Sequence, residues 1–197
     1  MELLPEIQFI PARYYTKHVV PRQVDLIVIH VTQNKELPGI AKGLADWISK
    51  PMAPGKQVSW GYLVDSAGII QSVKDNDIAW HAGRVNGYSI GIEHVGMSQQ
   101  TAEEWADAFS SAELDWSAKL VSKLCLCYNI PVQHVANEDI ASKIGRGICG
   151  HWDITEAFHI KGGHTDPGPN FPWIGYMNNV ARYYAAMRDA LATEATT

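Results

Sequence analysis

One segment near the start of the chain constrains the fold more than any other. Residues 25–31 read DLIVIHV, so apolar and mostly β-branched side chains fill nearly every position. A strand with one exposed face would alternate apolar and polar residues, whereas this run is typical of a strand buried on both faces. The segment therefore predicts a central strand in a sheet that is covered on both sides.

The remaining pattern predicts helices and strands in irregular alternation. One hairpin signal, the turn at 65–68, and no regular strand–helix–strand repeat favour a mixed sheet over a doubly wound one. Thr101, followed three residues later by Glu104, is a capping-box signature that predicts the start of a long helix. The expected helices cover residues 39–50, 101–128, 137–143 and 173–191; the expected strands cover 25–31, 58–64, 69–73, 88–95 and 147–152, and 153–172 is expected to be a long loop.

The chain length of 197 residues predicts a single domain. Residues 1–24 have no clear periodicity and are expected to form an irregular lead-in. The folded domain is then expected over 25–191, and the threonine-bearing tail 192–197 is typical of a linker. The predicted fold class is thus α/β, a single domain with a central mixed sheet flanked by helices.

Charge and composition exclude several classes of function. There are 16 Lys and Arg against 21 Asp and Glu, a net charge of −5, and no basic run, so no nucleic-acid partner is expected. No apolar run approaches the roughly 18 residues that a membrane helix needs, so no membrane insertion is expected. The first six residues lack a basic region and an apolar region, which predicts synthesis in the cytoplasm without a signal peptide.

The chain has eight His but only three Cys, and neutral imidazole is the commonest metal ligand in proteins. His30 ends the apolar strand, His151 lies in the segment CGHWD, and Asp166 precedes Pro-Gly. Two His and one carboxylate, with one position left open, form the ligand set of a catalytic zinc site. Each residue also has a plain structural interpretation, and Cys149 or His159 could approach the same ion.

Five short motifs occur in a fixed order along residues 25–175. They read IVIH at 27–30, WHAG at 80–83, SIGIE at 89–93, GHWD at 150–153 and TDPG at 165–168. On these motifs the chain resembles the zinc-dependent N-acetylmuramoyl-L-alanine amidases of the peptidoglycan-recognition-protein fold, also called amidase type 2. That family includes phage endolysins and cytosolic wall-recycling amidases. The resemblance implies that His30, His151 and Asp166 bind Zn²⁺ and that Glu93 is the general base.

Two positions depart from the family pattern. Many members carry a Lys two residues before the last ligand, where this chain has His164. An imidazole can donate a hydrogen bond to the oxyanion, so His164 is predicted to stabilise the transition state, with a pH dependence that a Lys would not show. Trp60 stands where relatives often carry Ala or Tyr before a His. Four residues are predicted to contact substrate: Trp60, Trp80, His81 and Asn86.

The resemblance implies hydrolysis of the amide bond between N-acetylmuramic acid and L-alanine in peptidoglycan. The expected setting is the catalytic domain of a phage endolysin, which reaches the bacterial wall through a phage-encoded membrane pore. The tail at 192–197 could then join a wall-binding module absent from this chain. Two alternatives stay open: an amidase that remains in the cytoplasm and recycles anhydromuropeptides, and a peptidoglycan-binding module without catalysis.

Overall fold

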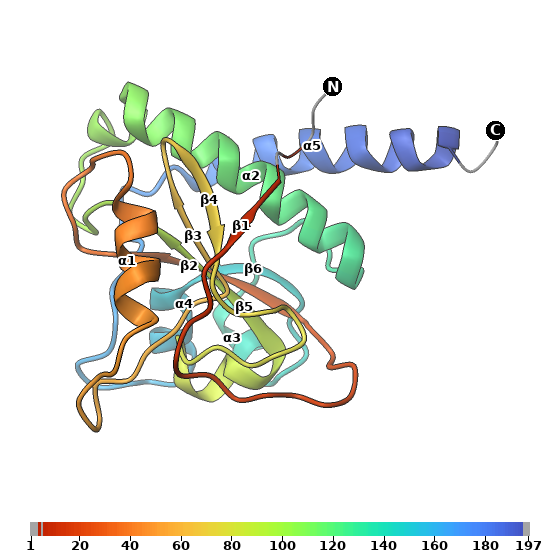
Figure 1. Cartoon of the computed structure of the whole chain (residues 1–197). Coiled ribbons are helices and arrows are strands. Elements are labelled where there is room, and N and C mark those ends of the chain that lie inside the picture. The colour runs from red at the N-terminus through yellow and green to blue at the C-terminus, as the bar shows by residue number, and fades with distance from the viewer. Residues whose placement is uncertain (1–3, 5, 195–197) are drawn as a thin grey trace.

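The structure, a computed structural model, describes residues 4 and 6–194. Its centre is a six-stranded mixed sheet with the strand order β1-β4-β3-β5-β2-β6 (Figure 1). Strands β3 and β4 pair antiparallel as a hairpin, and the other neighbouring strands run parallel. The strands are β1 (Gln8–Phe9), β2 (Leu26–Val31), β3 (Tyr62–Asp65), β4 (Gly68–Gln71), β5 (Ser89–His94) and β6 (Gly147–Gly150).

The predicted central strand is confirmed as β2. It lies between β5 and β6, and all six of its residues are buried. In the parallel register with β5, His30 lies beside Glu93. Because paired residues of neighbouring strands point to the same face of a sheet, these two side chains share one face near the carboxyl ends of their strands. The register therefore brings together two residues that are 63 positions apart in the sequence.

Helices cover the two faces of the sheet unequally (Figure 1). Two long helices, α2 (Ala108–Tyr128) and α5 (Trp173–Glu194), pack on one face around Ile27, Ile29 and Ile92. The other face is covered in part by α1 (Ile40–Ile48), α3 (Asn137–Ala141), α4 (His151–Ala157) and the 3-10 helix η1 (Gly83–Tyr88). The apolar side chains of this second face form two separate clusters, one under α1 and one under α3 and α4.

Several predicted boundaries are wrong. The lead-in contains strand β1, which pairs with β4, and the last helix continues past residue 191 to Glu194. Residues 195–197 of the predicted linker lie outside the described part of the chain. Thr101 and Glu104 do form the reciprocal bonds of a capping box, but these bonds lie at the start of the short 3-10 helix η2 (Glu104–Ala106). The long helix begins later, at Ala108, where the Asp107 carboxylate accepts the Ser110 N–H.

The predicted loop at 153–172 is wrong in its first part, because α4 begins directly after β6. Gly150 is the N-cap residue of α4, and its N–H donates to the Asp153 carboxylate at 2.7 Å. A helix of seven residues is too short to show a clear apolar period, which is why the sequence pattern does not reveal it. Helix α4 positions one residue of the site. His151 is the first residue of this helix, and its side chain is directed at the end of β2.

Candidate metal centre

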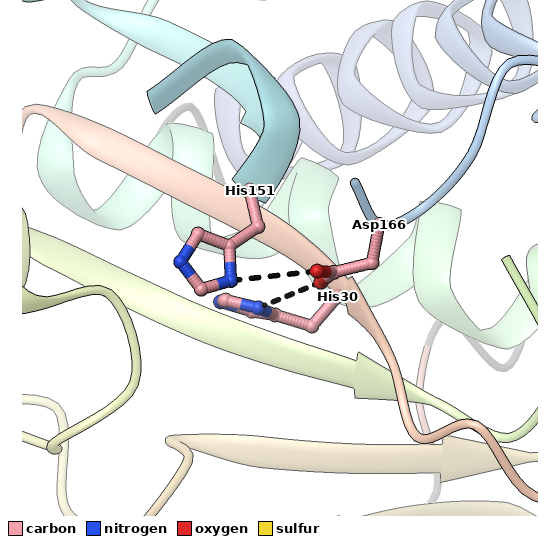
Figure 2. Close-up of side chains that lie close together, drawn as sticks. All are labelled: His30, His151 and Asp166. Atoms are coloured by element: carbon pink, nitrogen blue, oxygen red, sulfur yellow. Dashed lines mark hydrogen bonds and ion pairs between the residues drawn. The ribbon is translucent and has the colours of Figure 1, made fainter. Parts of the chain in front are cut away.

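Three residues from three separate elements converge at one end of the sheet (Figure 2). His30 comes from β2, His151 from the start of α4, and Asp166 from the segment before α5. All three are buried, and their potential ligand atoms lie within 4.8 Å of one another. His30 Nδ1 is 3.1 Å from Asp166 Oδ2, and His151 Nδ1 is 3.6 Å from Asp166 Oδ1. Both imidazoles thus direct Nδ1 at the same carboxylate.

This arrangement fits a bound metal ion. His151 Nδ1 is buried but has no hydrogen-bond partner among the described residues, which is rare for a buried polar atom unless a ligand or an ion satisfies it. Two imidazole nitrogens and one carboxylate oxygen are also the donor set of catalytic metal sites that keep a position open for water or substrate. Of the open alternatives, Cys149 packs in the apolar cluster under α4 and His159 is exposed; among the described residues neither belongs to the converging group.

Electrostatics keep two of the three groups, His151 and Asp166, in the forms that bind metals. Burial lowers the pKa of His151 to about 4, so its ring is neutral at physiological pH. Burial alone would raise the pKa of Asp166, but contacts with His151, His164 and His30 bring it well below its ordinary value. Asp166 is therefore ionised at physiological pH.

Glu93 lies in a cavity of about 280 Å³ next to the three converging residues. It is 4% exposed. Burial first, and the negative charge of Asp166 second, raise the pKa of Glu93 well above its ordinary value, while the Trp60 side chain opposes the shift. A carboxyl group with a raised pKa can hold and release a proton near neutral pH. The cavity is lined by His30, Val31, Thr32, Gln33, Val58, Trp60, Trp80, His81, Glu93, His151, His164 and Asp166.

His164 lies at the rim of this cavity and is largely exposed, at 67% of its side chain. Its ring stacks on that of His151 with the centroids 3.9 Å apart. His164 Nδ1 is 3.3 Å from Asp166 Oδ1, and this contact raises the pKa of His164. Since Nδ1 faces Asp166, Nε2 is the ring nitrogen on the side away from the carboxylate.

The four residues predicted to contact substrate divide into two groups. Trp60, Trp80 and His81 line the cavity, and the Trp80 indole N–H also donates to Thr16 Oγ1 at 2.9 Å. His81 lies beside His30, with its Nδ1 2.9 Å from His30 Nε2. The structure does not bring Asn86 to the cavity wall; its side-chain oxygen accepts the backbone N–H groups of His81 and Ala82.

Sequence reasoning did not find the cavity residues just after β2. Thr32 and Gln33 follow that strand, and both line the cavity. A usable signal existed, because ligands of open parallel sheets bind outside the carboxyl ends of the strands. Gln33 also has a positive φ of 60° and bonds to Ser98, so the chain turns sharply there.

No helix in the described part of the chain is long and apolar enough to span a membrane.

The sequence matches a known family over most of its length. Residues 20–169 match the family model described as N-acetylmuramoyl-L-alanine amidase. Among curated proteins, N-acetylmuramoyl-L-alanine amidase A of Achromobacter lyticus is 29% identical over 178 residues, covering 85% of this chain and 89% of that protein. The 1,6-anhydro-N-acetylmuramyl-L-alanine amidase AmpD of Haemophilus influenzae is 27% identical over 200 residues, covering 90% of this chain and 94% of that protein.

Solved structures show the same fold. The Staphylococcus aureus hydrolase AmiA, determined with its ligand, superposes with a TM-score of 0.66 at 16% identity, covering 94% of this chain and 86% of that one. A mutant endolysin from Bacillus subtilis superposes with a TM-score of 0.58 at 22% identity, covering 90% of this chain and 99% of that one. The chain therefore belongs to the N-acetylmuramoyl-L-alanine amidase family, and it is an enzyme that hydrolyses the peptidoglycan amide bond for which that family is named.

Proposed function

We propose that the protein is a zinc amidase that cuts between the lactyl group of N-acetylmuramic acid and L-alanine, as the catalytic domain of a phage endolysin. The observation that carries the chemistry is the convergence of His30, His151 and Asp166 beside Glu93 in one cavity. A metal-ligand set and a carboxyl group with a raised pKa are the parts needed for metal-assisted hydrolysis.

Zinc fits the donor set better than harder ions do. Imidazole nitrogens suit zinc, whereas magnesium and calcium prefer ligands that are all oxygen. His30 Nδ1, His151 Nδ1 and a carboxylate oxygen of Asp166 would hold the ion. When bound, zinc supplies a water whose pKa is lowered to about 7 and polarises the substrate carbonyl.

Glu93 is the proposed proton carrier. Its carboxylate takes a proton from the attacking water and then gives it to the leaving amino group of L-alanine. Burial and the neighbouring Asp166 raise its pKa, and a raised pKa is what a group needs to take up a proton and then donate it in the same cycle. Its position beside His30 in the β2–β5 register places it at the same end of the sheet as the ligand set.

His164 is the proposed oxyanion donor. Its Nε2 is directed away from Asp166 and can donate to the carbonyl oxygen as negative charge develops there. The stack on His151 and the contact with Asp166 fix the ring at the rim of the cavity. Trp60 and Trp80, which also line the cavity, offer flat apolar surfaces for the sugar or the stem peptide.

The proposed setting is lysis of the wall from outside the cytoplasm, reached through a phage-encoded membrane pore, with a separate wall-binding module for retention. The likeness to the endolysin fold supports this proposal. The similarity to AmpD favours the other candidate, an amidase that stays in the cytoplasm and recycles anhydromuropeptides. A binding module without catalysis is disfavoured, because the ligand set and Glu93 are all present.

One pair of assays tests both the reaction and the setting. Mass spectrometry of digested peptidoglycan should show free L-alanine amino termini and intact glycan strands, and the Glu93→Gln variant is the matched control. A cut at any other bond contradicts the proposed reaction. Loss of turbidity of intact sacculi supports the lytic setting, whereas hydrolysis of soluble anhydromuropeptide alone supports recycling.

A further inference from the structure

The side of His30 that faces away from Asp166 contacts a second histidine that the mechanism does not use. We propose that His81 is a positioning residue, which fixes the His30 ring so that the Nδ1 lone pair faces the metal site. Histidine ligands of metals almost always donate their other ring N–H to a partner that sets the tautomer and the ring orientation. His30 Nε2 and His81 Nδ1 are 2.9 Å apart, and the two rings meet at an interplanar angle of 87°.

His30, His81 and Ser89 form a row of hydrogen bonds that ends at the backbone carbonyl of Val85. That carbonyl fixes which atom donates in each bond. Ser89 Oγ is 2.9 Å from the Val85 carbonyl oxygen, which can only accept, so the single hydroxyl proton is used there. Ser89 Oγ must then accept from His81 Nε2, at 3.1 Å. A neutral imidazole carries one proton, so His81 Nδ1 is an acceptor and receives the proton of His30 Nε2.

In a neutral His30 ring the single proton is then on Nε2, so Nδ1 offers a lone pair. The lone pair of Nδ1 then faces Asp166 Oδ2 across 3.1 Å. Two such atoms repel each other unless a cation lies between them. The backbone carbonyl of Val85, two hydrogen bonds beyond His81, therefore determines which nitrogen of His30 is available as a ligand.

A glycine in β5 makes room for this arrangement. A Cβ at Gly91 would lie 2.6 Å from His81 Nδ1 and 2.7 Å from His81 Cγ, closer than any side chain can approach. The His81 ring thus packs directly on the backbone of β5. Ser89, Gly91 and Glu93 alternate along the strand and face the same side. This face of β5 supplies the hydrogen-bond acceptor, the space for the ring and the proposed proton carrier in turn.

The backbone at His81 is also held in place. The Asn86 side-chain oxygen accepts the N–H of His81 at 3.2 Å and that of Ala82 at 2.7 Å. These bonds fix the loop that carries the imidazole, which suits a residue whose role depends on the orientation of its ring. The inference rests on the proposed zinc function, because it concerns the affinity of the centre for that ion.

The first test measures zinc affinity by competition with a chromophoric chelator. Loss of a side chain that hydrogen-bonds to a metal ligand typically weakens metal binding by about 10- to 100-fold, and we expect this of His81→Leu. His81→Asn keeps an acceptor oxygen near the position of Nδ1 and should recover most of the affinity. His18→Leu is the matched control, because His18 bonds within its own loop to the Val20 carbonyl; its affinity should equal that of the unmodified protein.

The second test needs no variant. Long-range ¹⁵N–¹H correlation spectra of the zinc-loaded protein should show His81 protonated on Nε2 and His30 protonated on Nε2. A proton on His81 Nδ1 would overturn the inference, as would a folded His81→Leu protein with unchanged zinc affinity. If the unmodified protein binds no zinc, the proposed metal centre itself fails, and the two failures are thereby distinguished.

Discussion

Glu93 and Glu113 are both buried glutamates, but they lie on opposite sides of the central sheet. Glu93 points from β5 into the cavity, whereas Glu113 lies on α2 and is 0% exposed. Burial raises the pKa of both carboxyl groups well above the ordinary value. Glu113 accepts the Val95 N–H at 2.6 Å, and its second oxygen has no hydrogen-bond partner in the described part of the chain. A raised pKa therefore marks burial on either side, and only access to a cavity and to a ligand set distinguishes the functional group.

On the face of the sheet covered by α2 and α5, a buried histidine lies outside the cavity that Glu93 lines. His94 Nε2 contacts Ser117 Oγ at 2.7 Å, and the Ser117 hydroxyl in turn contacts Tyr176. Burial lowers the pKa of His94 to about 4. Its Nδ1 lies 3.2 Å from the backbone carbonyl of His30, so every polar atom of the ring is used within the fold. On the other face of the sheet, beside the cavity, His151 Nδ1 has no hydrogen-bond partner among the described residues.

The largest expected effect on zinc content and activity comes from a change at the cavity that Glu93 and Asp166 line. Asp166→Ala removes the carboxylate shared by both imidazoles, so bound zinc should fall from about one ion per chain towards none, and amidase activity should become undetectable. Elemental analysis of the purified protein measures the metal. Asp189→Ala, on the exposed part of α5, is the control that should keep its zinc. Full zinc occupancy in Asp166→Ala would remove Asp166 from the ligand set.

Glu93→Gln should leave zinc in place and lower kcat by about 10²- to 10⁴-fold, the usual contribution of a general acid–base group. The amide keeps the size of the carboxyl group but cannot accept and return the proton. Activity is measured as L-alanine amino termini released from peptidoglycan. An activity equal to that of the unmodified enzyme would show that Glu93 is merely a buried carboxyl group, like Glu113.

His164→Ala should lower kcat by about 10²- to 10³-fold, as expected when one donor to the oxyanion is removed. His164→Lys should retain more activity, because an ammonium group also donates to the oxyanion. Zinc content is measured alongside, since His164 contacts Asp166. A loss of zinc that accounts for the whole loss of activity would instead assign His164 to support of the ligand set.

The smallest effect on activity is expected from Glu113→Gln, on the face of the sheet covered by α2 and α5. Activity should not change, because Glu113 does not line the cavity. The pKa of Glu113 is raised in the folded protein, so above its ordinary value of 4.5 the unfolded chain releases a proton that the folded chain retains. Folding stability from this group therefore falls as pH rises. Gln carries no such penalty and keeps an acceptor for the Val95 N–H.

Thermal unfolding at several pH values measures this difference. The variant and the unmodified protein should have equal Tm at about pH 4, below the ordinary pKa of Glu, and the variant should gain in Tm as pH rises towards neutrality. A difference that is independent of pH would show that Glu113 is already ionised in the fold. That result would contradict the statement that burial raises the pKa of Glu113 as it does that of Glu93.

The amount that could be predicted from the sequence differs between elements. The run at 25–31 predicts β2 because its apolar content is continuous, and the turn at 65–68 predicts the β3–β4 hairpin. Helix α4 could not be predicted, since seven residues show no clear period. The start of α2 was misplaced because two capping signals follow each other, and the one at Thr101 closes only a 3-10 turn.

The candidate site divides in the same way. The ordered motifs were sufficient to name His30, His151, Asp166 and Glu93, and the structure brings all four to one cavity. The roles suggested for His81 and Asn86 could not be separated by sequence, because both lie in one short loop near the site. Their side chains point in different directions, one to His30 and one back to the loop backbone.

The sequence by itself determined the central strand and the single α/β domain, because these depend on residue type and local order. Its ordered motifs also named the candidate metal ligands, through the resemblance that they carry. Tertiary structure alone decided which nitrogen of each histidine faces Asp166, that Glu93 lies beside His30, and that the His81 ring contacts His30 as well as the cavity. Such facts depend on strand register and on hydrogen bonds between residues 51 to 136 positions apart. No local pattern encodes them, since they form only when the sheet and the helices that cover it pack together.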